Sequence, residues 1–232
     1  MTTIDLRAVP GVPECALSDS MLAQLPPDAP PAPWTVRCSS ITWYGRGGRA
    51  AARAAGTAVV PSGKALATIG GLVSYEDTPV GSYSEVFGVV AYRAGRSVRG
   101  TIPFMAVDLP ASLVGGRGNW SLPKTLAAFD GVPDPAGCVM SAIGDGWSVR
   151  ATARPLGPSF TVPMNGRMVQ PWPDGVLRES VLTGKGRSRS AVVTVEVSSR
   201  AGLPGWLRPG RHLGSVLSDV TFTLGESVAL SG

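Results

Sequence analysis

Lysine is rare in this chain, and the surroundings of one lysine indicate covalent chemistry. There are three lysines against eighteen arginines. Lys124 stands within residues 116–129, where Trp120, Pro123 and Phe129 are among the apolar neighbours. Because burial disfavours the charged form of an amine, we expect the pKa of Lys124 to be lowered. A neutral amine is the form that attacks a ketone carbonyl, although a lysine whose stem lies along apolar side chains is the commoner arrangement.

Two further polar residues stand beside apolar segments. Glu85 follows the turn-forming residues 81–84 and precedes the apolar stretch 86–92, so its carboxylate is placed to orient a substrate or transfer a proton. Arg37 precedes the apolar and aromatic stretch 41–44, and a guanidinium binds a carboxylate through two parallel hydrogen bonds. An exposed carboxylate at a strand end and a surface arginine remain the alternatives for these residues.

The sequence lacks the residue patterns of several other common catalytic and binding sites. A Ser-His-Asp triad would have to use the one histidine, His212, and no Gly-x-Ser-x-Gly motif is present. No phosphate-binding or dinucleotide-binding glycine motif opens a helix. Cys15, Cys38 and Cys138 are far apart and form no Cys-x-x-Cys pair, so we expect buried, reduced thiols and no metal site. We therefore predict that no metal or organic cofactor is needed.

Charge and hydropathy limit the classes of partner that this protein is expected to bind. The formal net charge is +5, but the arginines are scattered, so we do not expect nucleic-acid binding. The N-terminal residues lack the pattern of a signal peptide, and no apolar run reaches the eighteen or so residues of a spanning helix. Reduced thiols fit a cytoplasmic protein. We predict a cytoplasmic protein that binds a small molecule and no membrane.

The distribution of glycine and proline favours many short strands joined by turns. Thirty glycines and 21 prolines are spread along the chain rather than gathered in one linker. Apolar and polar residues alternate with period two in residues 147–154, 191–197 and 220–224, which predicts half-buried strands. Residues 64–75 and 85–92 are rich in β-branched and aromatic side chains and are further strand candidates. A mainly β fold follows.

Helices are expected to be few and short. Residues 48–55 contain mostly alanine and arginine, and Gly56 provides a natural stop. Residues 123–129 are a second candidate, with proline in the first turn. Residues 1–33 carry seven prolines and little periodicity, so we expect a proline-rich N-terminal arm that packs on the body or on a neighbouring subunit. Residues 34–232 then form one domain.

The order of these segments resembles the acetoacetate decarboxylase family. Tyr83-Ser84-Glu85 matches the family's Tyr-x-Glu element, and Gly116-Arg117 with Pro123-Lys124 matches its Gly-Arg-Glu-x-x-x-x-Pro-Lys element. The likeness covers about residues 34–225 and is most specific over 75–130. It implies a single-domain, acetoacetate decarboxylase-like β-barrel with a few short helices, and it implies a homo-oligomer.

The resemblance also implies roles for residues. Lys124 matches the lysine that forms a Schiff base with a β-keto acid, and Glu85 matches the active-site glutamate. Arg37 stands seven residues before a tyrosine, as does an arginine that helps to hold the substrate carboxylate in the family. The substrate-binding residues expected on this basis are Arg37, Tyr83 and Trp120.

Two departures from the family pattern bear on the reaction. Thr125 replaces the second lysine of the decarboxylases, so the activation of the amine would depend more on desolvation. Gly118 replaces the acid of the Gly-Arg-Glu element. We predict a Schiff-base lyase that decarboxylates a β-keto acid through Lys124. The alternatives are an aldolase, dehydratase or cyclase acting on an oxo acid or polyketide-like substrate, and a non-catalytic barrel that binds a hydrophobic carboxylate.

Overall fold

The computed structural model describes residues 4–133 and 138–230, and most of them lie in β-strands. The helical elements are η1 (Leu6–Ala8), η2 (Pro13–Cys15), α1 (Asp19–Leu22), α2 (Arg49–Ala55), α3 (Pro110–Trp120) and η3 (Leu203–Gly205). The strands are β1 (Trp34–Gly48), β2 (Ala65–Asp77), β3 (Tyr83–Ala94), β4 (Ser97–Val107), β5 (Lys124–Leu126), β6 (Ala128–Val132), β7 (Cys138–Gly144), β8 (Trp147–Pro155), β9 (Phe160–Pro171), β10 (Leu177–Ser199), β11 (Gly210–Leu224) and β12 (Val228–Ala229).

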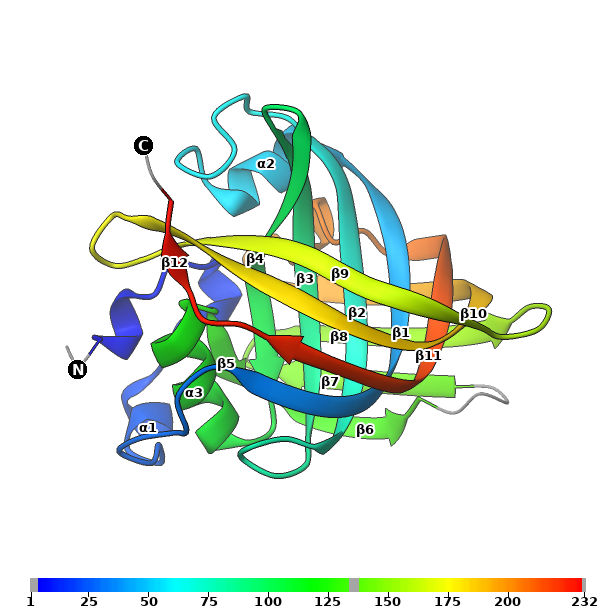
Figure 1. Cartoon of the computed structure of the whole chain (residues 1–232), viewed down its shortest axis with the longest axis horizontal. Coiled ribbons are helices and arrows are strands. Elements are labelled where there is room, and N and C mark those ends of the chain that lie inside the picture. The colour runs from blue at the N-terminus through cyan, green and yellow to red at the C-terminus, as the bar shows by residue number, and fades with distance from the viewer. Residues whose placement is uncertain (1–3, 134–137, 231–232) are drawn as a thin grey trace.

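Seven of the strands form a closed ring of pairings. Their order is β11-β1-β2-β3-β4-β9-β10, and β10 also pairs with β11. Strands β8, β7 and β6 continue the sheet from residues 191–199 of β10, while β5 pairs with β4 in parallel. In Figure 1, β9, β10 and β11 cross in front of β1 to β4. The ring therefore encloses an interior, and β5 lies where the ring meets α3.

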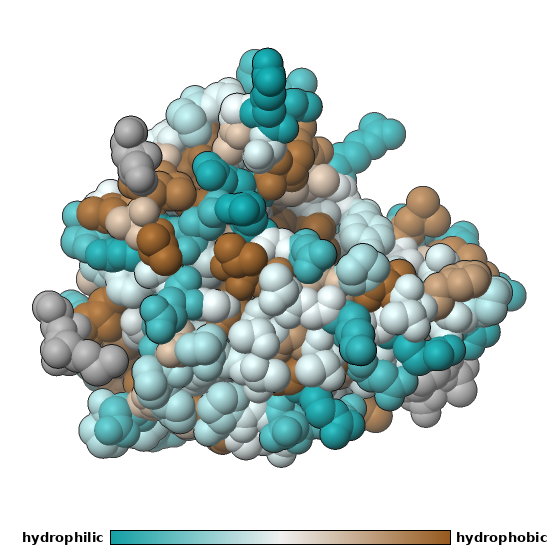
Figure 2. All heavy atoms as spheres, in the orientation of Figure 1, coloured by the Kyte–Doolittle hydropathy of each residue, from teal (hydrophilic) through white to brown (hydrophobic). Residues whose placement is uncertain are grey.

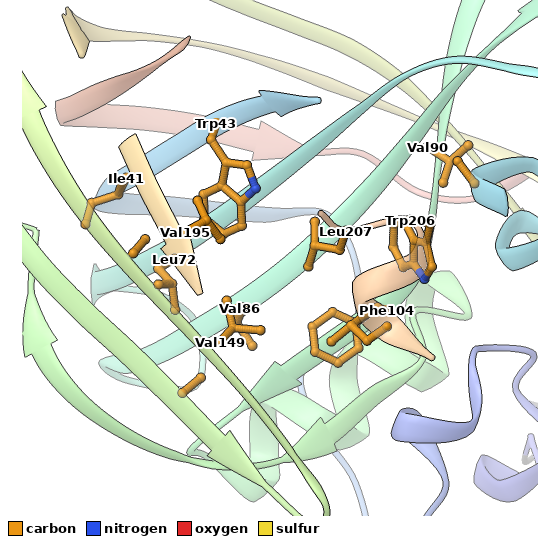
Figure 3. Packing of buried hydrophobic residues seen from close by; sticks show 14 of the residues in the cluster. Ile41, Trp43, Leu72, Val86, Val90, Phe104, Val149, Val195, Trp206 and Leu207 are labelled. Carbon is orange, nitrogen blue, oxygen red and sulfur yellow. The ribbon is translucent and has the colours of Figure 1, made fainter. Parts of the chain in front are cut away.

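The sheet buries apolar side chains on both of its faces. Along β3 and β4, alternate residues belong to two different clusters, as the period of a strand requires. One cluster lies between the sheet, the β6–β8 extension and η3, and Figure 3 shows its members converging. The other lies inside the ring and includes Met105, Val107, Leu217 and Val220. We call this second group the ring interior.

Polar and apolar side chains are not separated on the surface seen in Figure 2. Hydrophobic and hydrophilic side chains are interspersed over this face. No helix in the described ranges is long and apolar enough to cross a membrane.

Most of the expected elements are confirmed. Four of the five strand predictions fall within β3, β8, β10 and β11, and the fifth begins one residue before β2. The helix predicted at residues 48–55 is α2, with Gly48 as its N-cap. Cys15, Cys38 and Cys138 are buried and form no disulfide.

The helix expected at residues 123–129 is wrong. Residues Lys124–Leu126 instead pair with Met105–Val107, and the helix of this region is α3, which the sequence analysis missed. Three glycines make α3 a poor helix former by propensity. Pro110 in its first turn favours the helical start, and burial of Leu113 and Gly116 against the body compensates for the low propensity.

The N-terminal segment packs closely beside β5. The backbone N–H of Val12 donates to the carbonyl of Pro103 (2.9 Å), next to the part of β4 that pairs with β5. A Cβ at Gly11 would stand 2.4 Å from Cβ of Pro123, so only glycine fits there. The segment contains short helical turns rather than one extended run. The division into an arm of residues 1–33 and a body of residues 34–232 stays a prediction.

Candidate active site

The backbone around Lys124 directs its side chain into the ring interior. Ser121 ends α3 in the left-handed conformation (φ 53°), and Leu122 N–H bonds back to the carbonyl of Gly116. After this corner, Lys124 pairs with Met105 on β4. Neighbouring residues of paired strands point to the same face, so the lysine joins the side of Met105. Lys124 is 3% exposed.

The amine of Lys124 has three acceptors around it. Nζ lies 2.8 Å from Oε2 of Glu85, 2.9 Å from Oγ of Ser112 and 3.5 Å from the hydroxyl of Tyr83. These residues come from β3 and from the first turn of α3. An ammonium group has three N–H donors, and each has a partner here. The arrangement therefore holds the protonated amine.

Tyr75 supports the other side of the glutamate. Its hydroxyl donates to Oε1 of Glu85 (3.2 Å), and its ring stacks on that of Tyr83 with centroids 4.4 Å apart. Tyr75 is directly opposite Tyr83 in the β2–β3 register, and Val73 is opposite Glu85. The register therefore places both phenols on the face that carries the carboxylate.

The expected direction of the lysine pKa is wrong. Burial does act to lower the pKa of Lys124, as the sequence analysis argued. The Glu85 carboxylate and the Tyr83 phenol outweigh burial, and the net pKa is raised above that of a free lysine. The apolar neighbours were visible in the sequence, whereas the contact with Glu85 depends on the fold. At neutral pH the amine of Lys124 is therefore protonated.

Three other ionisable groups in the ring interior stay uncharged at neutral pH. Burial raises the pKa of Tyr83 to about 12 and that of Tyr75 well above its ordinary value, with Glu85 adding to both. Burial, and then Glu85, raise the pKa of the Cys38 thiol to about 12. The charges facing one another are thus those of Lys124 and Glu85.

Arg117 fixes the backbone of the lysine. Its guanidinium donates to the carbonyl of Lys124 (2.6 Å), to that of Leu6 (2.5 Å) and to that of Cys15 (2.6 Å). The side chain is 1% exposed, and burial lowers its pKa to about 10. One buried cation therefore ties β5, α3 and the N-terminal segment together.

No protein-family model and no curated protein matches the chain. Solved structures do match in fold. Acetoacetate decarboxylase from Legionella pneumophila is 15% identical, with a TM-score of 0.62 over 87% of this chain and 88% of that one. An acetoacetate decarboxylase-like enzyme from Sphingomonas wittichii is 16% identical, with a TM-score of 0.61 over 88% and 95%. The enduracididine biosynthesis enzyme MppR, complexed with pyruvate, is 15% identical, with a TM-score of 0.57 over 87% and 91%.

The chain has the acetoacetate decarboxylase-like fold. At these identities the likeness shows the fold alone, so the roles of individual residues depend on the geometry of the site. Within this fold, the structure brings together three of the residues singled out in the sequence, namely Lys124, Glu85 and Tyr83.

The other two expected substrate-binding residues lie elsewhere in the acetoacetate decarboxylase-like fold. Arg37 points outward from β1, with 61% of its side chain exposed, and pairs with Glu76 at 3.4 Å. Trp120 is buried but packs edge-on against Trp34, and its indole N–H donates to the carbonyl of Gly225 (2.7 Å). The structure does not bring either side chain to the amine of Lys124.

The two departures from the family pattern have different surroundings. Thr125 is buried, and its hydroxyl lies 3.7 Å from the sulfur of Met21 in the N-terminal segment. A Cβ at Gly118 would meet nothing within 4 Å. Thr125 therefore contributes to packing of the arm, and Gly118 is not required by close contacts.

Sequence reasoning missed Ser112 and Tyr75. Ser112 follows Pro110 in the first turn of α3, and recognising that helix would have placed it near the lysine. Tyr75 and Val73 are two residues apart in β2 and so lie on the same face of the sheet. Because Val73 pairs with Glu85, the register of the strands places Tyr75 beside Glu85. The described residues contain no group of three or more His, Cys, Asp or Glu side chains suited to a metal. A surface hollow of about 270 Å³ lies away from this cluster, beside residues 157–159 and β11.

Proposed function

We propose that the chain is a Schiff-base-forming carbon–carbon lyase in which Lys124 is the attacking amine. The observation that carries the proposal is the buried contact of 2.8 Å between Lys124 Nζ and Glu85 Oε2. Taking a lysine out of water is costly, and a purely structural role is served by apolar residues at least as well. A buried amine with an adjacent proton acceptor suits nucleophilic attack on a carbonyl.

The proton donors and acceptors around Lys124 suit the formation of an imine. The ammonium of Lys124 first transfers a proton to Glu85, which leaves a neutral amine. The amine attacks the substrate carbonyl carbon and forms a carbinolamine. Protonation of the carbinolamine hydroxyl then lets water leave, and the carbon–nitrogen double bond forms. The hydroxyls of Ser112 and Tyr83 lie at 2.9 and 3.5 Å from Nζ, within reach of that leaving oxygen.

Decarboxylation of a β-keto acid, such as acetoacetate or a larger analogue, is the first reaction of this class. The bond to the carboxylate carbon breaks, carbon dioxide leaves, and its electron pair enters the protonated imine to give an enamine. Protonation of the enamine carbon and hydrolysis of the imine release a ketone. No metal or organic cofactor takes part in these steps.

Aldol or dehydration chemistry on an oxo compound is the second candidate. It uses the same imine and enamine, but the electron pair comes from a C–H bond or from the C–C bond of a β-hydroxy carbonyl compound. The observation that favours it is Thr125, a buried threonine in contact with Met21 where the decarboxylase pattern has a second lysine. The activation of Lys124 then depends on Glu85 and burial.

Borohydride trapping tests the shared step. We expect a covalent mass increase on incubation with oxo compounds and borohydride, absent in Lys124→Ala and retained in a matched variant of an exposed lysine, Lys64→Ala. Release of carbon dioxide from β-keto acids distinguishes decarboxylation from the second candidate. If no oxo compound gives an adduct between pH 6 and 11, a range that allows for the raised pKa of Lys124, the chain is a non-catalytic barrel.

Location and assembly belong to the same proposal. We propose a cytoplasmic protein that forms a homo-oligomer. Fractionation of cells and the mass of the native particle in solution test these two statements.

A further inference from the structure

The charges of the candidate site are already balanced. Lys124 and Glu85 are each 3% exposed, and their charged atoms lie 2.8 Å apart. The second oxygen of Glu85 accepts a hydrogen bond from the hydroxyl of Tyr75. The amine therefore has an internal counter-ion that comes from the protein, and the pair as a whole is neutral.

The groups around this pair add no net charge that could receive a substrate anion. Each nitrogen of the Arg117 guanidinium donates to a backbone carbonyl, and the guanidinium of Arg37 lies on the outer face of β1. Tyr75, Tyr83 and Cys38 keep their protons. Apolar side chains pack around these groups in the ring interior, among them Val36, Val73, Met105, Leu217, Val220 and the adjoining Met168.

An anionic substrate would disturb this balance. A carboxylate attached close to the reacting carbonyl would lie within a few ångströms of the Glu85 carboxylate. Because Lys124 is already neutralised by Glu85, no free cation offsets the cost of taking that carboxylate out of water. A neutral substrate avoids this cost and gains from contact with the apolar side chains.

We propose that Lys124 acts on an uncharged ketone or aldehyde with an apolar body, and not on a β-keto acid. This inference rests on the proposed function and selects between its two reactions, since an uncharged ketone has no carbon dioxide to lose. For a β-hydroxy ketone, the hydroxyl proton passes to Glu85 and the C–C bond breaks. One fragment leaves as an aldehyde, and the electron pair enters the iminium to give an enamine. Protonation at carbon and hydrolysis then release the second fragment as a ketone.

Matched ligands that differ in charge test the inference. We would compare borohydride adducts formed with acetoacetate and methyl acetoacetate, and with 4-oxopentanoate and its methyl ester. The expected result is that each ester is trapped at least about tenfold faster than its acid. Equal trapping, or faster trapping of the acids, would overturn the inference and leave the imine-forming lysine intact. The absence of any adduct would instead remove the proposed function on which the inference depends.

A substitution of the counter-ion tests the cause of the preference. Glu85→Gln keeps the size of the side chain but removes its negative charge. We expect the ratio of ester to acid trapping to fall several-fold, because the acid's own carboxylate can then pair with Lys124. The circular dichroism spectrum and the urea midpoint of the variant show whether it is folded, independently of its activity. An unchanged ratio would mean that Glu85 does not exclude anions, and the inference would fail.

Discussion

Gly116 of α3 lies directly against the side chain of Lys124. A Cβ at Gly116 would stand 2.5 Å from Cδ of the lysine and 2.6 Å from Cε. Real side chains do not approach so closely, so the absence of a side chain at Gly116 creates the path along which the lysine reaches Glu85. The helix thereby sets the position of the amine.

Gly116→Ala is therefore expected to displace the amine. A shift of about 1 Å at a reacting group costs on the order of a hundredfold in rate, and we expect a loss of that size in the rate of borohydride trapping. Gly118→Ala is the matched control, because it lies in the same helix with open space at its Cβ. It should trap at the normal rate and gain up to about 1 kcal/mol in stability. Equal trapping rates in the two variants would contradict the role given to Gly116.

Glu85→Gln is expected to lower the pKa of Lys124. Burial acts to lower this pKa and Glu85 acts to raise it, so removal of the carboxylate leaves burial as the main influence. The pH at which the trapping rate with a neutral ketone is half-maximal should fall relative to the unmodified protein. The measurement is the rate of adduct formation from pH 6 to 11. A midpoint that stays in place would show that Glu85 does not hold the amine protonated.

Ser112→Ala is expected to leave one N–H of the lysine without an acceptor. An unsatisfied buried donor costs about 1–3 kcal/mol, and the loss should appear as a lower urea midpoint with an unchanged slope. Ser190→Ala, on the exposed side of β10, should change stability by less than about 0.5 kcal/mol. Equal midpoints for the two variants would show that the 2.9 Å contact contributes nothing.

Arg117→Lys is expected to release the N-terminal segment. A lysine keeps the charge but cannot reproduce the planar fork that serves three carbonyls. We expect a loss of about 1–3 kcal/mol in stability for each carbonyl left without a donor, with faster amide hydrogen exchange in residues 4–22 and at Lys124. Arg178→Lys, whose partner Asp174 is half-exposed, is the control and should leave exchange in these residues unchanged. Slow exchange in Arg117→Lys would show that other contacts hold the segment.

Alkaline pH is expected to destabilise the fold through two thiols. Burial raises the pKa of Cys15 and Cys38 from 9.0 to about 12 in the folded chain. Above pH 9 these thiols ionise in the unfolded chain but not in the folded one, so stability is full below pH 9 and is lost as pH rises toward 12. Each thiol contributes a slope of about 1.4 kcal/mol per pH unit. Urea midpoints at pH 8 and 10, in the presence of a reductant, provide the check. Equal midpoints would contradict the prediction.

Much of the fold, and the central lysine of the candidate site, could be predicted from local patterns. Alternation identified three strands, and β-branched and aromatic content identified two more. Lys124 was singled out by its apolar neighbours together with the resemblance to the acetoacetate decarboxylase family. The same alternation also carried information that was not used: Val36 and Cys38 face inward, so Arg37 between them must face outward. Contacts of Ser112 and Tyr75 with the pair depend on how a glycine-bearing helix packs and on strand register. Neither is fixed by residues close in sequence.

The three hydrogen bonds of Arg117 to backbone carbonyls affect the order in which the chain folds during synthesis. Its guanidinium joins the carbonyls of Leu6 and Cys15, which are 111 and 102 residues away in sequence. Residues 6–15 leave the ribosome long before their partner exists, and closing so long a loop is slow. The backbone of Lys124 therefore gains this support only after more than half of the chain has been made.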